Sequence, residues 1–317
     1  MKLSKEDKDM MQRDQLPITT NVKLITLFLM TEKGHAVLTK IVKKYKPLLE
    51  LVVIGSDKAL KKDFEEEIIN VCIIENINYI KQADFTKIKS EYALAVSWRW
   101  MIKHPVEKLI IFHDSLLPKY RGFAPLVNAL INGEKEIGVS ALFGANEFDT
   151  GNIIYQSKTK ITYPITINEA IQINNKNYIK CAEEVLRRIF KGESIEGVKQ
   201  DESKATYSVW RDDDDYEIDW SDSAPNIRKM VDALGSPYEG AKTKIDGKLI
   251  RIIQVEVYPD VIIANRHCGK VIFIDDGKPV VICGQGLIKI TVANLAEAGE
   301  TINFFPLSKF RIRFQKK

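Results

Sequence analysis

Apolar runs of strand length alternate with segments of helical periodicity through the first 200 residues of this 317-residue chain. Between the runs, apolar residues recur at the three- and four-residue spacing of an amphipathic helix. Strands that are joined through helices pair in parallel, because each return crossing needs a dozen or more residues. The alternation therefore predicts an α/β fold with a Rossmann-like, mostly parallel sheet. The apolar runs lie at 23–30, 48–57, 93–98 and 108–112.

The rest of the chain shows a different pattern of apolar and turn residues. Residues 137–143 and 152–161 alternate as two further strands, whose pairing the pattern allows to be antiparallel, before a long helix at 167–193. After residue 200, one short helix precedes short strands that are separated by turn residues, a pattern typical of a small β-barrel. The sequence thus divides into three parts. They are a polar N-terminal extension (1–20), an α/β domain (21–200) and a linker with an OB-like β domain (201–317).

The composition limits the classes of function. Lys and Arg number 47 against 43 Asp and Glu, and a net charge of +4 is too small to indicate nucleic-acid binding. The four cysteines form no CxxC pair, which favours a reduced, cytoplasmic protein and provides no ligand spacing for a metal. No apolar run approaches the ~20 residues that span a membrane, and the charged N-terminus is unlike a signal peptide. We therefore expect a cytoplasmic protein without a metal.

Two polar side chains follow predicted strands at the positions where α/β sheets bind ligands. His113 comes directly after the apolar run 108–112, and Asp149 follows the run 137–143. Ligands of open α/β sheets bind at the carboxyl ends of the strands. The loop after His113 is stiffened by prolines and carries Lys119 and Arg121, which suit an anionic ligand. A histidine that merely caps a strand end is the alternative interpretation.

These segments resemble a known family. "FHDSLLPKYRGFAP" and "NGEKEIGVSALFGANEFDTGNII" are similar to the formyltransferases that use N10-formyltetrahydrofolate, among them methionyl-tRNA formyltransferase, phosphoribosylglycinamide formyltransferase and sugar-nucleotide N-formyltransferases. Their signature is Asn-x-His, Ser-Leu-Leu-Pro, Arg-Gly and a later Asp-x-Gly. The segment "YEIDWSDSAPNIRKMVDALGSPYEGAKTKIDGKLIRI" resembles the linker and second domain of the longer members. The resemblance implies a formyltransferase catalytic domain over 21–200.

The resemblance assigns His113 and Asp149 as catalytic residues, with His113 transferring protons and Asp149 supporting it. The Asn of the signature, which stabilises the developing oxyanion, is replaced here by Ile111. Loss of one such donor costs about 100- to 1,000-fold in rate. Ser115, Asn146 or a backbone N–H are the candidates to compensate; otherwise the enzyme is slow, or the chain binds ligands without catalysis.

The resemblance also implies two sets of binding residues. The residues expected to hold formyltetrahydrofolate are Ser97, Trp98, Arg99, Trp100, Met101, Ile102, Leu116, Leu117, Arg121 and Gly122. The residues expected at the substrate are Lys119, Tyr120 and Ser115. The alternative for Trp98 and Trp100 is that they are core aromatics.

The acceptor is expected to be a primary amine on a nucleotide-linked amino sugar, as in surface-polysaccharide biosynthesis. Methionyl-tRNA formyltransferases carry a basic loop after their second strand, whereas this chain has "GSDKALKKDFEEEI" there, so a nucleic-acid partner is not expected. A purine-pathway enzyme would not need the C-terminal domain. The alternatives are a methionyl-tRNA formyltransferase, a hydrolase that passes the formyl group to water, and a folate- or nucleotide-binding protein of weak or no activity. Analogy with sugar enzymes suggests a homodimer.

Overall fold

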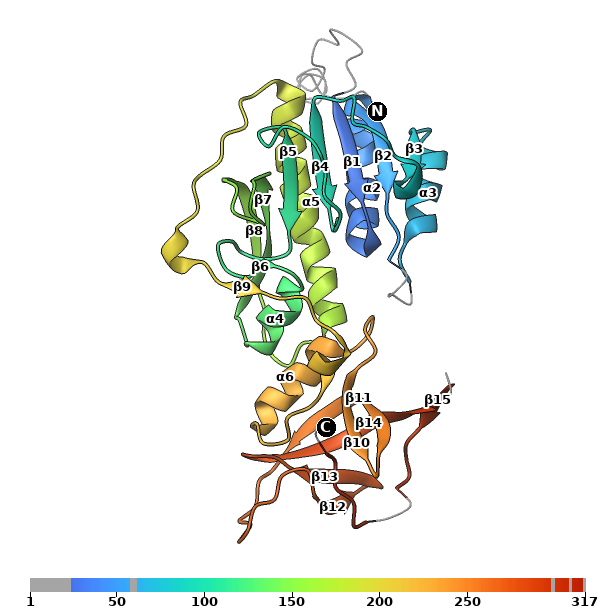
Figure 1. Cartoon of the computed structure of the whole chain (residues 1–317), viewed down its shortest axis with the longest axis vertical. Coiled ribbons are helices and arrows are strands. Elements are labelled where there is room, and N and C mark those ends of the chain that lie inside the picture. Colours follow the sequence, from blue (N-terminus) through green and yellow to red (C-terminus); the bar gives the residue numbers. More distant parts are fainter. Residues whose placement is uncertain (1–23, 58–61, 298–299, 308–309, 316–317) are drawn as a thin grey trace, which may run out of the picture.

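A computed structural model describes residues 24–57, 62–297, 300–307 and 310–315; the expected polar extension (1–20) lies outside them. Figure 1 shows an α/β domain above a smaller β domain, with helix α6 (Ala224–Leu234) between the two. The sequence prediction of an α/β fold followed by a small β domain is confirmed.

The α/β domain is built on a seven-stranded sheet in the order β3-β2-β1-β4-β5-β7-β8. The first five strands pair in parallel. Strands β7 and β8 are antiparallel to their neighbours, as the sequence pattern allows. The strands are β1 (Ile25–Leu29), β2 (Leu49–Ile54), β3 (Tyr79–Lys81), β4 (Tyr92–Val96), β5 (Leu109–His113), β7 (Glu136–Phe143) and β8 (Ile153–Lys160).

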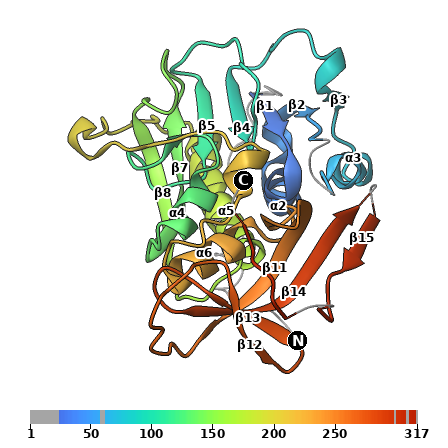
Figure 2. The same cartoon turned by 60° about the horizontal axis from the view of Figure 1, so that its bottom comes forward.

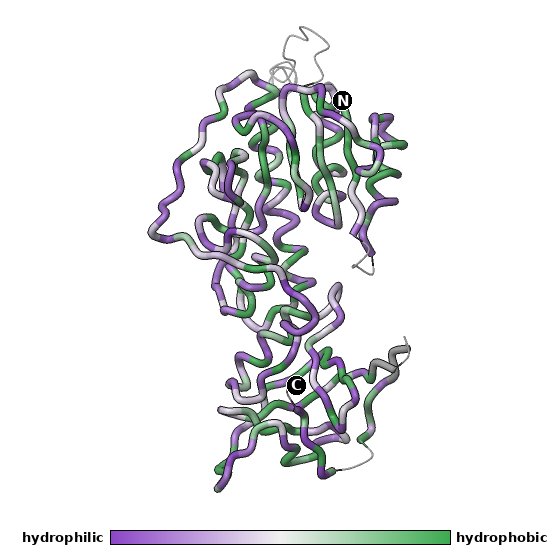
Figure 3. Tube along the Cα trace, in the orientation of Figure 1, coloured by the Kyte–Doolittle hydropathy of each residue, from purple (hydrophilic) through white to green (hydrophobic). Residues whose placement is uncertain are grey.

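One face of this sheet is covered by helices. The helices α2 (Thr31–Tyr45), α3 (Glu65–Ile74) and α5 (Ile167–Lys191) turn their apolar stripes onto it, where Leu38, Ile110 and Val185 are buried. On the opposite face a smaller cluster gathers around Phe28 and Val53. The hydropathy colours of Figure 3 show the central strands as largely hydrophobic and the segment after α5 as largely hydrophilic. These side chains are the ones that the alternating pattern of the strands and the three- and four-residue spacing of the helices place on the inward faces.

A linker follows α5 and passes back to the loop that follows β5. In Figure 1 it descends along the β8 side, and its strand β9 (Tyr207–Ser208) pairs in parallel with β6 (Arg121–Gly122). It then forms the 3₁₀ turn Asp213–Tyr216. In this turn Asp213 forms ion pairs with Lys242 and Arg251 of the β domain.

The β domain is an antiparallel sheet in the order β10-β11-β14-β13-β12, with β15 on β14. Its apolar core is continuous with α4 (Pro125–Ile131) and the start of α5, so the two domains share buried side chains. The view of Figure 2 brings this domain forward, below α4 and α6. The strands are β10 (Ala241–Ile245), β11 (Lys248–Tyr258), β12 (Val271–Asp275), β13 (Lys278–Ile282), β14 (Leu287–Glu297) and β15 (Glu300–Asn303). Within the described residues, no helix has the length and apolar character to cross a membrane.

The long helix α5 begins with a reciprocal cap. Thr166 Oγ1 accepts a hydrogen bond from the backbone N–H of Glu169 at 3.3 Å, and the Glu169 carboxylate accepts one from the Thr166 N–H at 2.8 Å. We expect Thr166→Ala to lower the free energy of unfolding by about 1 kcal/mol, because it leaves a helix N–H unsatisfied. Urea unfolding checks this, and Thr166→Ser is the matched control because it keeps the oxygen. Equal loss in both variants would contradict the role of the cap.

Candidate active site

Strand β5 delivers His113 to the carboxyl edge of the sheet, which faces the β domain (Figure 1). Its neighbour β4 ends at the same level, since Val96 pairs with Phe112. The parallel register therefore sets Ser97, the first residue after β4, beside His113. The residues after β5 then form the loop 114–120, which leads into β6 and α4.

Both ring nitrogens of His113 face oxygen atoms, and the side chain is only 8% exposed. Nε2 lies 2.8 Å from the carbonyl oxygen of Tyr120, to which it must donate, because a carbonyl only accepts. Nδ1 lies 3.5 Å from Asp149 Oδ1. That separation is longer than an ordinary hydrogen bond, and such contacts in catalytic sites often shorten only when substrate binds. The structure thus brings together His113 and Asp149, although they are 36 residues apart.

Asp149 is held in an uncommon backbone conformation. Its φ of 57° lies in the left-handed region, which Asp adopts more readily than most residues. Its Oδ2 accepts a hydrogen bond of 2.8 Å from the backbone N–H of Gly122. One carboxylate oxygen is therefore fixed by β6, and the other is left to face His113.

Arg121, which the resemblance assigns to the cofactor, makes its contacts within the protein. Its side chain is 1% exposed, and its guanidinium donates to both carboxylate oxygens of Glu202 at 2.8 Å and to Gln200 Oε1 at 2.9 Å. The hydrogen bonds to Glu202 raise the pKa of Arg121. A charge buried inside the protein must be paired, and here the linker supplies the partner.

The segment Ser97–Ile102 forms an aromatic layer over the ends of β1 and β2. Trp98 packs edge-on against Phe28 and Trp100, with 5.0 Å between ring centroids in each pair. Trp100 occupies space that Gly55 leaves open, because a Cβ there would lie 2.6 Å from the ring.

The other members of this segment are spread between surface and core. Arg99 lies over the Trp100 ring and pairs with Asp57 at 3.1 Å, whereas Met101 is 80% exposed. Ser97 accepts a hydrogen bond from Thr31, and Ile102 packs against the Phe28 cluster. Their assignment to a cofactor stays a prediction.

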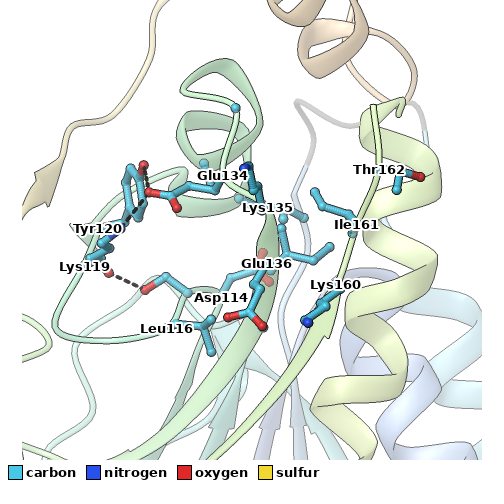
Figure 4. Close-up of a pocket in the computed structure, with 16 residues that line it drawn as sticks. Asp114, Leu116, Lys119, Tyr120, Glu134, Lys135, Glu136, Lys160, Ile161 and Thr162 are labelled. Carbon is cyan, nitrogen blue, oxygen red and sulfur yellow. Dashed lines mark hydrogen bonds and ion pairs between the residues drawn. The ribbon is translucent and has the colours of Figure 1, made fainter. Parts of the chain in front are cut away.

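A cavity of about 880 Å³ lies beside the loop 114–120, lined also by α4, β7 and the end of β8 (Figure 4). Ser115, Leu116, Lys119 and Tyr120 line it, but neither His113 nor Ser97–Ile102 does. Leu116 lies against Gly138 of β7, and Leu117 is buried. The expected binding residues therefore divide into two groups, one beside His113 and one in this cavity.

Most polar groups of the loop already have partners. Lys119 Nζ lies 3.0 Å from the Glu134 carboxylate, to which the Tyr120 hydroxyl also donates at 2.9 Å. Ser115 donates its hydroxyl to the carbonyl of Lys119 at 2.7 Å, and Asn146 is exposed. The Ser115 hydroxyl is thus already in use, and the role of Asn146 as a replacement for the missing amide stays a prediction.

Ile111 occupies the position of the expected amide and points to the same face of the sheet as His113. Its side chain is half-buried and packs with Trp98 against the cluster around Phe28. An apolar residue is consistent with this environment, because an unpaired amide there would lose its hydrogen bonds to water.

Three residues near the site were not predicted from the sequence. Gln200 donates to the backbone carbonyls of Asp149 and Gly151, and Thr206 accepts from the N–H of Tyr120. Asp114 points to the opposite face from His113, where it pairs with Lys33 and accepts from Asn174 at 2.7 Å. Of the three, only Asp114 could have been placed near the site from the sequence, because it directly follows His113.

The close approach of β6 and β9 requires Gly122. Its φ is 101°, and an added Cβ would lie 2.4 Å from the carbonyl oxygen of Ser208. We expect Gly122→Ala to destabilise the protein by more than Gly192→Ala, which has a φ of 64° but no neighbouring atom within 4 Å. The control should cost about 1 kcal/mol. Urea unfolding measures both; equal losses would contradict the steric role of β9.

Comparison with known proteins places the chain in a family. The formyl transferase family matches residues 35–178, and the formyl transferase C-terminal domain matches residues 211–302. A methionyl-tRNA formyltransferase from Syntrophomonas wolfei is 30% identical over 261 residues, which cover 80% of this chain and 79% of the relative. Another, from Carboxydothermus hydrogenoformans, is 36% identical over 177 residues, or 56% of each chain.

Two solved structures share the fold. An N-formyltransferase from Helicobacter canadensis, in complex with folinic acid and dTDP-3-aminofucose, has a TM-score of 0.67 at 20% identity and covers 85% of this chain and 99% of its own. The sugar 3N-formyl transferase WlaRD has a TM-score of 0.64 at 19% identity, with 92% and 100% covered. Because sequence identity extends through both domains, the chain belongs to the formyl transferase family and is a formyltransferase.

Proposed function

We propose that this enzyme transfers the formyl group of N10-formyltetrahydrofolate to the primary amine of a nucleotide-linked amino sugar. The observation that carries the chemistry is the position of His113, between Asp149 and the Tyr120 carbonyl at the carboxyl edge of the sheet. Because Nε2 donates to the Tyr120 carbonyl, Nδ1 is the ring nitrogen that can accept the proton that the amine loses on attack and return it to the leaving nitrogen.

The segment Ser97–Ile102 fits the pterin ring of the donor. Its two indole rings pack against each other, and Trp98 Nε1 is buried without a hydrogen-bond partner among the described residues. A buried N–H without an acceptor is uncommon and is consistent with a partner supplied by a ligand. Bound there, formyltetrahydrofolate would supply the formyl group, and Asp149 would keep His113 oriented.

The charge of the C-terminal part favours a small acceptor over tRNA. Residues 201–317 contain 17 Lys and Arg against 18 Asp and Glu. Proteins that bind nucleic acid neutralise several phosphates with unpaired cations. Here Lys242 and Arg251 of the β domain already pair with Asp213, and Arg266 with Asp260. Of the two structural neighbours named above, one was solved with dTDP-3-aminofucose and the other, a sugar 3N-formyl transferase, with dTDP, which supports the same choice.

A methionyl-tRNA acceptor is the second candidate, because the Syntrophomonas relative carries that name at 30% identity. One assay separates the possibilities: the enzyme receives N10-formyltetrahydrofolate with dTDP- or UDP-linked amino sugars, with methionyl-tRNA, or without an amine, and tetrahydrofolate release is followed. Release only with an amino-sugar nucleotide supports the proposal, and release with methionyl-tRNA supports the second candidate. Release without an amine would indicate hydrolysis, and bound folate without release would contradict catalysis.

We expect His113→Ala to abolish formyl transfer, because no other titratable ring occupies the position between Asp149 and Tyr120. The matched control is His104→Ala. His104 is half-buried and bonds only the Glu91 carbonyl among the described residues, so its loss should leave the rate within about twofold. Single-turnover rates measure both variants. An undiminished rate for His113→Ala would refute its assignment.

We expect Ile111→Asn to raise kcat by up to about 100-fold if no other group stabilises the oxyanion, because the amide restores a donor. Ile111→Leu is the matched control, since Leu has the shape of Asn but no N–H. Steady-state kinetics compare the two variants with the unmodified enzyme. An unchanged or lower kcat in a folded Ile111→Asn protein would show that another donor is already in place.

A further inference from the structure

Both oxygen partners of His113 are held by one stretch of the linker. The carbonyl of Tyr120 belongs to a loop whose backbone pairs with residues 206–208. The Tyr120 N–H donates to Thr206 Oγ1 at 2.9 Å, the Arg121 N–H donates to the Thr206 carbonyl at 2.9 Å, and Phe123 donates to Ser208 at 3.0 Å. The loop that presents this carbonyl is thus fixed from the linker side.

Asp149, the second partner, is held by Gln200. The Gln200 side-chain nitrogen donates to the Asp149 carbonyl at 2.6 Å and to the Gly151 carbonyl at 2.8 Å. These two bonds bracket the left-handed turn that aims the Asp149 carboxylate at His113. Gln200 is 5% exposed, so water does not compete for these groups.

Both the oxygen and the nitrogen of the Gln200 amide form hydrogen bonds. Its oxygen accepts from Arg121 Nε at 3.2 Å and from Nη2 at 2.9 Å, while its nitrogen makes the two bonds to carbonyls. No other side chain of this size both donates twice and accepts twice in this way. A carboxylate could keep the contact with Arg121 but would face two carbonyl oxygens with no proton to donate.

We propose that Gln200 is a positioning residue for the reaction. It fixes the turn at Asp149, while Thr206 fixes the Tyr120 carbonyl, so that linker residues 200–208 set the orientation of the His113 ring. The proposal deepens the proposed function and rests on it, since it assumes that His113 performs the transfer. Neither residue contacts the ring, and each acts through a partner of His113.

The first test compares Gln200→Glu with Gln254→Glu, an isosteric change at an exposed position of β11. We expect Gln200→Glu to lower kcat by about 100-fold with a much smaller change in KM, because small displacements of a catalytic group reduce rates by such factors. Gln254→Glu should change neither constant. A variant Gln200→Glu that is folded and has an unchanged kcat would overturn the proposal.

The second test does not depend on activity. In protein labelled with ¹⁵N-histidine, the four ring spectra are recorded and His113 is identified from the His113→Ala protein. Thr206→Val removes the acceptor of the Tyr120 N–H, so we expect faster solvent exchange of the His113 Nε2 proton. Thr206→Ser, which keeps the oxygen, should restore slow exchange. Gln200→Glu should shift the Nδ1 signal, and Gln254→Glu should not.

The kinetic and NMR measurements test the proposed function and the positioning role separately. If the unmodified protein transfers formyl to none of the acceptors, the proposed function fails, and the ring signals still report whether residues 200–208 orient His113. If Thr206→Val and Gln200→Glu leave those signals unchanged, the positioning role is refuted, whatever the activity. If Gln200→Glu does not fold, the comparison of Thr206→Val with Thr206→Ser alone tests the positioning role.

Discussion

The buried guanidinium of Arg121 is the constraint on which the arrangement of the site depends. An unpaired charge inside a protein costs several kcal/mol, so this side chain is stable there only with acceptors around it. Those acceptors, Glu202 and Gln200, come from the linker, about 80 residues later in the chain. Pairing them with Arg121 draws the linker across β6, and the same Gln200 then reaches the turn at Asp149. The contacts that neutralise Arg121 therefore also position the carboxylate that we propose to be catalytic.

The elements of the α/β domain could be predicted because burial leaves a periodic trace in sequence. The apolar run that ends at His113 predicts a strand whose last residue lies at the ligand edge, and β5 is that strand. The turn containing Asp149 follows β7 for the same reason. Gln200 and Thr206 leave no such trace. They lie in a polar linker without periodicity, and their role exists only because the chain returns to the sheet.

The basic loop shows that cations beside a candidate site can be paired within the protein itself. Lys119 and Arg121 stand close together in sequence and suggest an anionic ligand. In the structure each has a carboxylate partner from elsewhere, Glu134 for Lys119 and Glu202 for Arg121. The geometry of a β-strand also separates neighbouring residues onto the two faces of the sheet. Since successive residues point to opposite faces, His113 faces Asp149, whereas Asp114 faces α2 and α5. The loop after them borders the cavity, whereas His113 does not line it.

Packing also explains how Ile111 is compatible with the rest of this site. Its side chain shares an apolar cluster with Trp98, next to the layer in which Trp98 and Trp100 pack against each other. An amide in that cluster would need a hydrogen-bond partner, and an unsatisfied buried polar group costs about 1–3 kcal/mol. The apolar residue at 111 therefore stabilises the aromatic layer, at a position where the family signature has a hydrogen-bond donor. Stability of the aromatic layer and stabilisation of the oxyanion make opposite demands on this one position, so a change that favours one is expected to cost the other.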